Sequence, residues 1–345
     1  MSTTELRNVL SEAYGLTGIR LSRLASGSQT DNHRGDLPSG ETVFVKAGRP
    51  DPGFRYGHAE AHSGAELSET ARVSGVPAPA VRRNRAGGLV TRTSNGVLTV
   101  WDFIDADPQT DPLTPDRAED VGRILGRLHT RFAELPAQAR RQRGDGWIEG
   151  ASGPLITRAH DLMSTIESLP HPSTADLDRR ERLQRRVEHL GTLPELRRSL
   201  PRTISRGLGH GDYSRVNLLW RGDRVAGVLD FLGDDVPLAW ELGRIAFDSL
   251  TVATSPTWRE SALACAYGYR RANPHLSPDD FLAAPLMMAL HALCSLYGVY
   301  EHYHRPNPVK EVQEDNTQYW TNRDIAVTTV LDELDALRAD LADLL

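Results

Sequence analysis

Lysine and cysteine are both scarce in this chain of 345 residues, and each scarcity is informative. The 40 basic residues include only two lysines, Lys46 and Lys310, so arginine is the ordinary cation of this sequence. The two cysteines, Cys265 and Cys294, lie in apolar stretches with helical spacing. This setting favours buried, reduced thiols over a disulfide framework or a thiolate metal site.

Long apolar runs are missing as well. No stretch reaches the roughly 20 apolar residues of a membrane-spanning helix, and the segment 1–16 lacks the basic and apolar parts of a secretion signal. The formal net charge of −6 disfavours a general affinity for nucleic acid. We therefore expect a cytoplasmic protein without membrane or nucleic-acid partners, and 39% hydrophobic content is enough to fill two lobes.

The most informative motif is His-Gly-Asp-Tyr-Ser-Arg-Val-Asn at residues 210–217. Its Asp212 and Asn217 are followed by a second carboxylate, Asp230, beyond two apolar runs. Phosphoryl transfer from a magnesium nucleotide requires one carboxylate to take a hydroxyl proton and two oxygen ligands for the cation. Turn formation explains the Gly and Asp between the two runs, but not the acidic residues that flank the runs.

The two apolar runs, 216–220 and 225–229, predict a hairpin with a tight turn between them. With the turn centred between residues 222 and 223, Asn217 would lie opposite about Val228, and Asp230 just beyond. Both oxygen ligands would then emerge at the open end of one hairpin. Asp212 would lie at the same end, in the segment 210–217, which we call the acidic loop.

This pattern resembles the superfamily of aminoglycoside phosphotransferases, choline kinases and homoserine kinases, which carry H-G-D-x-x-x-x-N, then an apolar strand and D-F or D-W. The resemblance covers nearly the whole chain. It implies a bilobal protein-kinase-like α/β (α+β) fold. The small, β-rich N-terminal lobe would span 1–100, the hinge 101–105, and the large, mainly helical C-terminal lobe 106–345.

The resemblance also implies a role for each residue of the motif, with ATP and Mg²⁺ as cofactors. Asp212 would be the catalytic base or hydroxyl-orienting residue, Asn217 and Asp230 the magnesium ligands, and His210 a brace behind the catalytic loop. Glu241 stands where the family usually has an Asp that anchors this loop. The residues after the second carboxylate depart from the family pattern, which leaves the number of magnesium ions open.

A kinase of this type should hold the nucleotide phosphates in its N-terminal lobe. The expected strand 41–46 ends in Lys46, and a compact ammonium suits this position better than a guanidinium. On the expected helix 60–74, Glu60 and Glu66 are both candidate partners for this lysine, and family spacing favours Glu66. The other expected nucleotide contacts are the turn Ser26, Gly27 and Ser28 and the hinge residues Asp102, Phe103 and Ile104.

The remaining elements follow from periodicity. We expect strands at 88–90 and 97–101, a helix at 120–132, a helical stretch at about 164–200 and a mostly helical tail from 258 to 345.

The acceptor is not readable from the motifs. We favour an aminoglycoside or related amine-bearing antibiotic, with homoserine, an amino alcohol or a sugar as alternatives. Acidic residues that could face a cationic substrate, or simply be solvated, are Asp234, Asp235 and Glu301. A nucleotide-binding pseudoenzyme or regulatory scaffold is the competing class, and either a monomer or a homodimer is compatible with the sequence.

The sequence disfavours two other kinds of site, a zinc protease centre and a phosphate-binding loop at a helix start. His58, Glu60 and His62 form H-x-E-x-H rather than the H-E-x-x-H of zinc proteases, and the sequence marks no third ligand. The phosphate-binding run G-x-x-x-x-G-K-[ST] is absent, and Lys46 falls on an expected strand rather than at a helix start.

Overall fold

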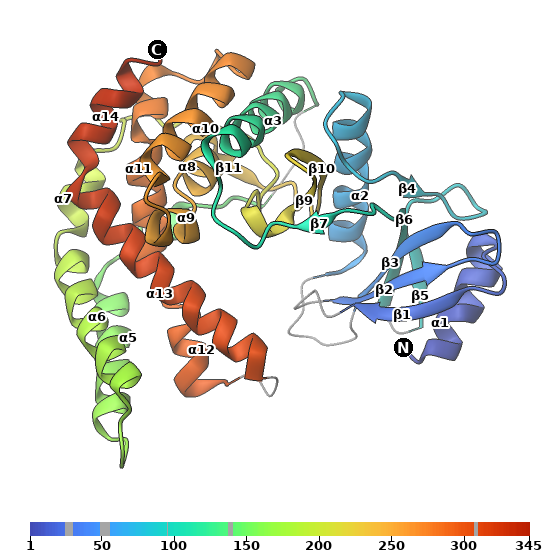
Figure 1. Ribbon diagram of the computed structural model, residues 1–345, viewed down its shortest axis with the longest axis horizontal. Coiled ribbons are helices and arrows are strands. Elements are labelled where there is room, and N and C mark those ends of the chain that lie inside the picture. The colour runs from blue at the N-terminus through green and yellow to red at the C-terminus, as the bar shows by residue number, and fades with distance from the viewer. Residues whose placement is uncertain (25–29, 49–55, 95, 137–140, 307–309) are drawn as a thin grey trace. The chain divides into compact units, whose positions relative to one another are not determined.

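The computed structural model (Figure 1) describes residues 1–24, 30–48, 56–94, 96–136, 141–306 and 310–345. The chain divides into two compact units. The first contains 1–109, 210–212 and 216–233, and the second contains 110–209, 213–215 and 234–345. Residues 210–212 and the hairpin thus pack with the N-terminal segment, whereas residues 213–215 between them pack with the second unit.

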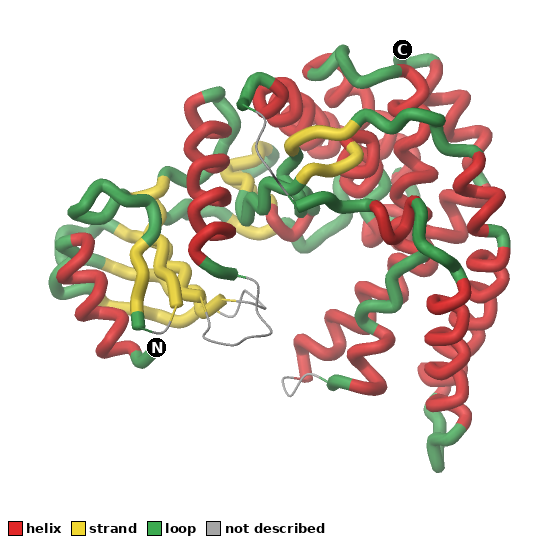
Figure 2. Tube along the Cα trace, turned by 180° about the vertical axis from the view of Figure 1, so that it is seen from behind, coloured by secondary structure: helices red, strands yellow, loops and turns green. Residues whose placement is uncertain are grey.

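The first unit is built on an antiparallel sheet whose strands lie side by side in Figure 2. Its strand order is β1-β2-β3-β6-β4, with β5 also paired to β6. The strands are β1 Arg20–Leu24, β2 Thr30–Asp36, β3 Thr42–Gly48, β4 Val81–Arg82, β5 Thr91–Thr93 and β6 Gly96–Asp102. The expected strand at 88–90 is wrong, because Asn84 accepts backbone N–H bonds from Ala86 and Gly88 and holds this segment in a turn.

Alternation along β3 decides which face each residue takes. Val43 and Val45 are buried in a core with Leu6 and Leu10, contributed by α1 Thr3–Val9 and the π-helical turn Leu10–Tyr14 that follows it. Phe44 packs instead against the cluster that includes Ala61 and Ala65 of helix α2 His58–Val73. Lys46, two residues after Phe44, therefore lies on the sheet face that α2 covers.

A second, three-stranded sheet in this unit has the order β10-β9-β7. Strands β9 Leu218–Arg221 and β10 Arg224–Val228 form the expected hairpin, and β7 Asp107–Pro108 pairs with β9. The hairpin is fixed to the rest of the unit by the Val228 N–H, which donates to the Pro77 carbonyl at 2.8 Å.

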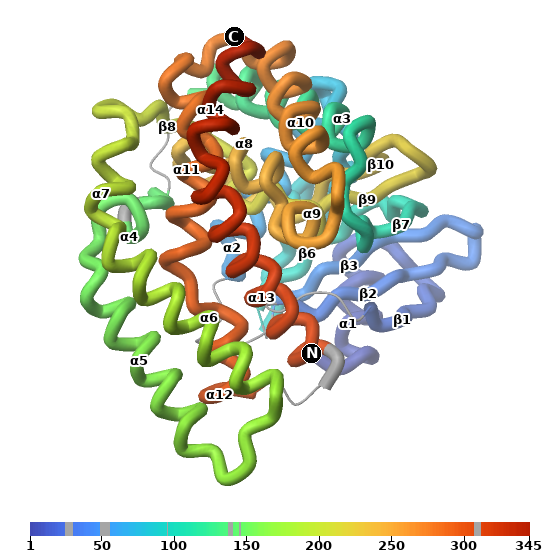
Figure 3. The backbone as a smooth tube through the Cα atoms, turned by 60° about the vertical axis from the view of Figure 1, so that its left-hand side comes forward, coloured from blue at the N-terminus to red at the C-terminus, as the bar shows by residue number. Residues whose placement is uncertain are grey.

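The second unit is mainly helical, with one two-stranded sheet of β8 Arg206–Leu208 and β11 Asp235–Pro237. Its helices are α3 Pro115–Ala133, α4 Asp145–Ile148, α5 Gly153–Glu167, α6 Thr174–Gly191, α7 Leu193–Arg198, α8 Leu238–Ala246, α9 Ser249–Thr254, α10 Trp258–Ala272, α11 Pro278–Leu293, α12 Val299–His304, α13 Lys310–Asp332 and α14 Leu334–Ala342. The expected stretch 164–200 is three helices, of which α5 and α6 lie side by side (Figure 3).

Helices α3 and α10 approach closely because each helix presents a glycine to the backbone of the other. A Cβ added at Gly122 of α3 would lie 1.9 Å from the Cys265 carbonyl oxygen, and one at Gly268 of α10 would lie 2.2 Å from that of Glu119. Both separations are far below van der Waals contact, so the packing requires glycine at these positions. Within the described ranges, no helix is both long and apolar enough to cross a membrane.

Candidate active site

The hairpin brings the motif residues to its open end, in a register one residue away from the expected one. Strand pairing begins with Arg221 opposite Arg224, but a bulge between Val225 and Gly227 shifts the later pairs. As a result Asn217 faces Leu229 rather than Val228, and its carbonyl accepts the Leu229 N–H at 2.9 Å. Asp230 directly follows this last paired residue.

Asp212 and Asn217 are held together in the acidic loop. The Asn217 side-chain Nδ2 donates to the Asp212 backbone oxygen at 2.9 Å and to its carboxylate Oδ2 at 3.0 Å. A 3₁₀ turn at Arg215–Asn217 closes the loop and allows both bonds. Because Nδ2 is committed to Asp212, the amide oxygen is the atom that Asn217 can offer to a cation.

His210 ties this loop to the end of β10. Its Nε2 lies 2.8 Å from the Leu229 carbonyl oxygen, which can only accept, so Nε2 carries the proton. Its Nδ1 then accepts the Asp212 N–H at 3.2 Å, and its own carbonyl accepts N–H bonds from Leu232 and Gly233. The fully buried His210 therefore fixes the backbone of the acidic loop and of the turn after the second carboxylate.

Lys46 forms an ion pair with Asp230, 2.6 Å from Nζ to Oδ1, and the two residues are 184 positions apart in the sequence. The lysine side chain is 13% exposed and Asp230 is 50% exposed. Burial disfavours the charged lysine, but the nearby Asp230 carboxylate outweighs this cost, and the pKa of Lys46 lies above its usual value. The ammonium also lies 4.9 Å from the centre of the Tyr56 ring.

Asp230 is the one non-glycine residue in the described part of the chain with positive φ, at 61°. This left-handed conformation costs a residue with a Cβ about 1–2 kcal/mol, and such outliers gather at functional sites. The conformation occurs where the chain leaves β10 and the carboxylate meets Lys46. The backbone at this position thus stores strain that the surrounding hydrogen bonds of His210 maintain.

This strain predicts that glycine at position 230 gives a more stable protein than alanine, which is the reverse of their usual order in helices and strands. Both Asp230→Ala and Asp230→Gly remove the ion pair with Lys46, but only alanine retains a Cβ in the left-handed region. We expect the glycine variant to have a free energy of unfolding about 1 kcal/mol above that of the alanine variant. Urea denaturation of the two proteins measures the difference, and an alanine variant at least as stable as the glycine variant would rule out strain at this residue.

The donor set at the hairpin end fits a hard divalent cation. It offers the carboxylate of Asp230 and the amide oxygen of Asn217, with neither thiolate nor imidazole. In the described ranges, no group of three or more His, Cys, Asp and Glu side chains is placed to hold a metal ion. Magnesium needs no such group, because it is commonly bound by one or two protein oxygens together with phosphate oxygens and water.

The two glutamates considered for Lys46 have other partners. Glu66 Oε2 lies 3.4 Å from Nδ1 of His62, and Glu60 Oε2 accepts the Gly57 N–H at 3.1 Å, which caps the start of α2. Among the described residues neither carboxylate pairs with Lys46. The His58 and His62 rings stack at 6.0 Å, so this helix start has a structural explanation without zinc.

The expected nucleotide-contacting segments are only partly described. Ser26, Gly27 and Ser28 lie outside the described residues. At the hinge, the Phe103 N–H donates to the Thr42 carbonyl at 3.4 Å. The Asp102 carboxylate accepts from Arg82 Nε at 2.8 Å. The Ile104 side chain lies against Gly227, where an added Cβ would be 2.6 Å from Ile104 Cδ1, so the hinge packs on the hairpin.

Glu241 lies in the second unit, in a fully buried pair with His129. Glu241 Oε2 is 2.9 Å from His129 Nε2, and His129 Nδ1 is 2.8 Å from the Tyr269 hydroxyl. A Cβ added at Gly209 would lie 2.4 Å from the same glutamate oxygen. The carboxylate thus packs against the residue that directly precedes His210.

Removal of this carboxylate should destabilise the protein strongly. In Glu241→Ala, His129 loses its charged partner in a dry interior, and we expect the free energy of unfolding to fall by about 3 kcal/mol. Glu241→Gln keeps an oxygen acceptor of nearly the same size and should cost only about 1 kcal/mol. Equilibrium denaturation compares the two variants, and equal losses would show that the acceptor for His129 does not matter.

The acidic residues expected to face a cationic acceptor have different surroundings. Asp234 is only 5% exposed, and both of its oxygens are engaged by the guanidinium groups of Arg141 and Arg143. Asp235 on β11 lies 3.6 Å from Arg206, and Glu301 is part of α12. In the structure the Asp234 carboxylate thus binds two arginines.

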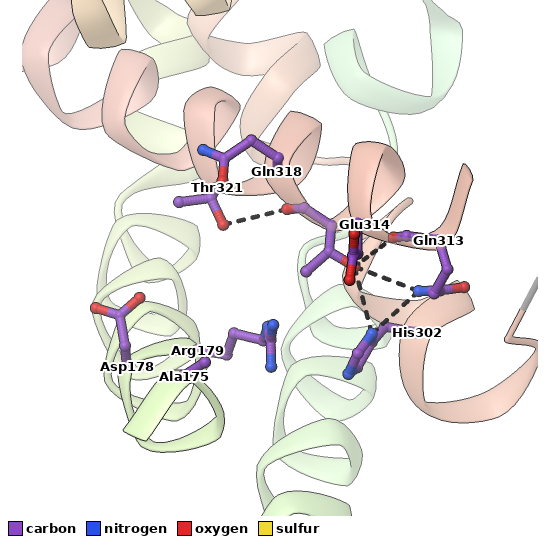
Figure 4. A pocket seen from close by; sticks show the side chains of 9 residues that line it. Ala175, Asp178, Arg179, His302, Gln313, Glu314, Gln318 and Thr321 are labelled. Carbon is purple, nitrogen blue, oxygen red and sulfur yellow. Dashed lines mark hydrogen bonds between the residues drawn. The ribbon is translucent and has the colours of Figure 1, made fainter. Parts of the chain in front are cut away.

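The sequence did not reveal a cavity of about 430 Å³ among α6, α12 and α13 (Figure 4). Apart from Ala175, its lining residues carry polar or charged groups: Ala175, Asp178, Arg179, His302, Gln313, Glu314, Thr317, Gln318 and Thr321. The Thr317 hydroxyl donates to the Gln313 carbonyl at 2.8 Å, while Gln313 Nε2 lies 3.0 Å from His302 Nδ1. The lining residues come from three separate helices, so no local motif marks the cavity.

Comparison with known proteins agrees with this geometry. The profile of the phosphotransferase enzyme family matches residues 21–275. A homoserine kinase of Parvibaculum lavamentivorans (strain DS-1) is 27% identical over 159 residues, which cover 46% of this chain. The chain spans 43% of the length of this curated relative.

Solved structures share the fold across nearly the whole chain. A spectinomycin phosphotransferase in complex with ADP and spectinomycin has a TM-score of 0.70 at 14% identity, with 95% of this chain and 97% of that chain covered. An aminopropanol kinase associated with a microcompartment has a TM-score of 0.61 at 18% identity, with both chains fully covered. An amicoumacin kinase, solved with AMP-PNP and Ca²⁺, has a TM-score of 0.63 at 12% identity, covering 95% and 93%.

The fold defines the class of protein, which is that of proteins with a protein-kinase-like phosphotransferase fold. More particularly, the chain belongs to the phosphotransferase enzyme family, because the family profile matches most of its length.

Proposed function

We propose that this protein transfers the γ-phosphoryl group of magnesium ATP to a hydroxyl group of a small molecule. The observation that carries the proposal is the pairing of Lys46 with Asp230 beside the loop that joins Asp212 to Asn217. This arrangement supplies a cation for phosphates, oxygen ligands for a metal and a carboxylate for the acceptor, which is the set that phosphoryl transfer requires.

Each residue has a distinct task in this proposal. Asn217 and Asp230 would hold Mg²⁺, which supplies charge neutralisation to the phosphates when it is bound. Lys46 would bind phosphate oxygens with its ammonium, and Asp230 keeps it in place beforehand. Asp212 would accept the hydrogen bond of the acceptor hydroxyl and take its proton as the oxygen attacks phosphorus. The bond from Asn217 Nδ2 orients the Asp212 carboxylate for that step.

We propose an amine-bearing, hydroxylated acceptor of the aminoglycoside type. Two observations support this choice. The similar solved structures include a spectinomycin phosphotransferase and an aminopropanol kinase. The cavity of the second unit is lined by the carboxylates of Asp178 and Glu314 and by glutamine and threonine side chains, which suit ammonium and hydroxyl groups. Its lining also includes Arg179, which pairs with Asp176 at 2.9 Å. Homoserine remains the alternative that the 27% identical relative favours.

Mass spectrometry of candidate acceptors tests the proposal. Aminoglycosides, peptide antibiotics, amino alcohols, homoserine and sugars are incubated with the protein and magnesium ATP, and each product is examined for one added phosphoryl group. A gain on an amine-bearing antibiotic supports the full proposal, and a gain only on another class corrects the acceptor. Bound ATP without any transfer, across the panel, would favour a pseudoenzyme.

A further inference from the structure

A group of aromatic and basic side chains surrounds His291 in the second unit. The His291 ring centre lies 5.1 Å from that of Trp240 on α8 and 6.0 Å from that of Trp147 on α4. Arg323 on α13 approaches the same ring, with Nη2 3.5 Å from His291 Nδ1. We call Trp147, Trp240, His291 and Arg323 the His291 cluster. It is separate from the polar cavity of Figure 4, with which it shares no residue.

Arg323 is a buried cation without a carboxylate. It is 6% exposed, and its hydrogen bonds go to neutral acceptors, the Ser295 hydroxyl at 3.1 Å and the His291 carbonyl at 3.3 Å. Among the described residues it forms no ion pair. Burial lowers its pKa, and the nearby guanidinium of Arg186 acts in the same direction. A buried charge normally requires a partner of opposite sign, because its desolvation is costly.

The fold provides such a partner for a comparable side chain nearby. Arg186 is also fully buried, yet it pairs with Asp324 at 3.0 Å and donates to backbone carbonyls at the end of α11 and just beyond it. Arg323 directly precedes Asp324, but that carboxylate is taken by Arg186 and, at 3.6 Å, by Arg182. Among the residues that the structure describes, the positive charge of Arg323 therefore has no carboxylate beside it. Its guanidinium carbon lies 5.4 Å from the centre of the Tyr319 ring, which attracts the cation without neutralising it.

A further donor of the cluster lacks an acceptor, and it lies beside a neutral histidine. Trp240 is 1% exposed, and its indole N–H has no hydrogen-bond partner among the described residues. His291 accepts from Arg323 at Nδ1, so its neutral ring carries the proton on Nε2. Burial, and then the charges of Arg323, Arg244 and Arg143, keep the pKa of His291 well below its usual value, so the ring is neutral at pH 7.

We propose that the His291 cluster is a binding site for an oxyanion, a carboxylate or a phosphate group carried by a small molecule. An oxyanion supplies what the cluster lacks, namely negative charge for Arg323 and acceptor lone pairs for the indole N–H. Arginine is well suited to this task because its guanidinium can bind two oxygens at once. His291 retains partial solvent exposure, which gives a small anion access to the cluster.

Phosphate binding to an Arg323→Met variant tests the site. The full-length protein carries Lys46→Ala throughout, which removes the cation expected at the nucleotide phosphates. Inorganic phosphate and succinate are titrated by calorimetry at constant ionic strength, and thermal unfolding is followed in parallel. We expect Arg323→Met to weaken binding of the preferred anion at least tenfold and to abolish the anion-dependent rise in melting temperature. In buffer without the anions, its melting temperature should not be lower than that of the parent.

The matched control is Arg180→Met, which removes an exposed guanidinium paired with Glu167 on the surface of the same unit. It should bind both anions as the parent does. Trp240→Phe removes the indole N–H and should weaken anion binding about threefold while the protein still folds normally. This variant therefore tests anion binding at the His291 cluster even if Arg323→Met does not fold. Stronger binding of phosphate or of succinate identifies the anion class. Unchanged anion binding in Arg323→Met and Trp240→Phe, with a lower melting temperature for the arginine variant, would show that Arg323 is purely structural.

Discussion

Asp212→Asn should lower kcat by about 10²- to 10⁴-fold and leave the affinity for magnesium nucleotide nearly unchanged. The amide has almost the same size as the carboxylate and can still accept the bond from Asn217 Nδ2, so the loop should keep its shape. It cannot take the proton of an acceptor hydroxyl, which is the step assigned to Asp212. Steady-state kinetics with the acceptor found by mass spectrometry, together with a nucleotide titration, separate the two effects.

A matched control for this variant lies in the same hairpin. Asp223 occupies the turn between β9 and β10, so Asp223→Asn makes the same chemical change at the opposite end of the hairpin. It should retain the parent kcat within about twofold, because the group touches neither nucleotide nor acceptor in the proposed mechanism. Full turnover by Asp212→Asn would remove Asp212 from its catalytic role.

Lys46→Ala should raise the KM for ATP by about 10- to 150-fold. A hydrogen bond to a charged group contributes about 1.5–3 kcal/mol, and this substitution removes the cation that would contact the phosphates. It also releases Asp230, which loses its 2.6 Å partner and with it the fixed position of a metal ligand. We therefore expect kcat to fall together with nucleotide affinity.

Lys46→Arg is the informative companion to this variant. It keeps the positive charge, but the planar guanidinium is larger and cannot occupy the same point between Asp230 and the Tyr56 ring. We expect only partial recovery of ATP affinity, intermediate between the alanine variant and the parent. ATP kinetics identical to those of the parent in Lys46→Ala would contradict the nucleotide role of the lysine.

The local part of the site could be predicted from the sequence because a hairpin relates its residues by pairing alone. The order of Asp212, Asn217 and Asp230 around two short strands fixes which end of the hairpin they share. The one-residue error in register came from the bulge between Val225 and Gly227. Gly227 was the available signal for the bulge, because an isolated glycine within a strand often marks one.

Contacts between distant segments were not predictable in the same way. The sequence predicts a partner for Lys46 on the following helix, but in the structure the lysine pairs with Asp230, which lies 184 positions later. The sequence shows the negative charge of Asp234, but it does not show that this carboxylate pairs with two arginines that lie 91 and 93 positions earlier. Pairing over such separations depends on the tertiary fold, and spacing along the chain does not encode it.

The division into compact units also depends on tertiary contacts. The hairpin follows helices α3 to α7 in the sequence, yet it packs with the first unit through Pro77, Ile104 and Lys46. A boundary drawn along the sequence cannot assign a later segment to an earlier unit. Helix and strand types were largely correct, whereas the first sheet strands, β1 and β2, lacked a clear alternating pattern and were not expected.

We propose that Lys46, Asn217 and Asp230 form a site for a magnesium nucleotide, with Asp212 beside it. A crystal structure with Mg²⁺ and a non-hydrolysable ATP analogue would show this site directly. We predict a metal ion bound to the Asn217 amide oxygen and the Asp230 carboxylate, with the Lys46 ammonium on phosphate oxygens. A nucleotide bound elsewhere, or a metal held on the phosphates without either of these side chains, would contradict it.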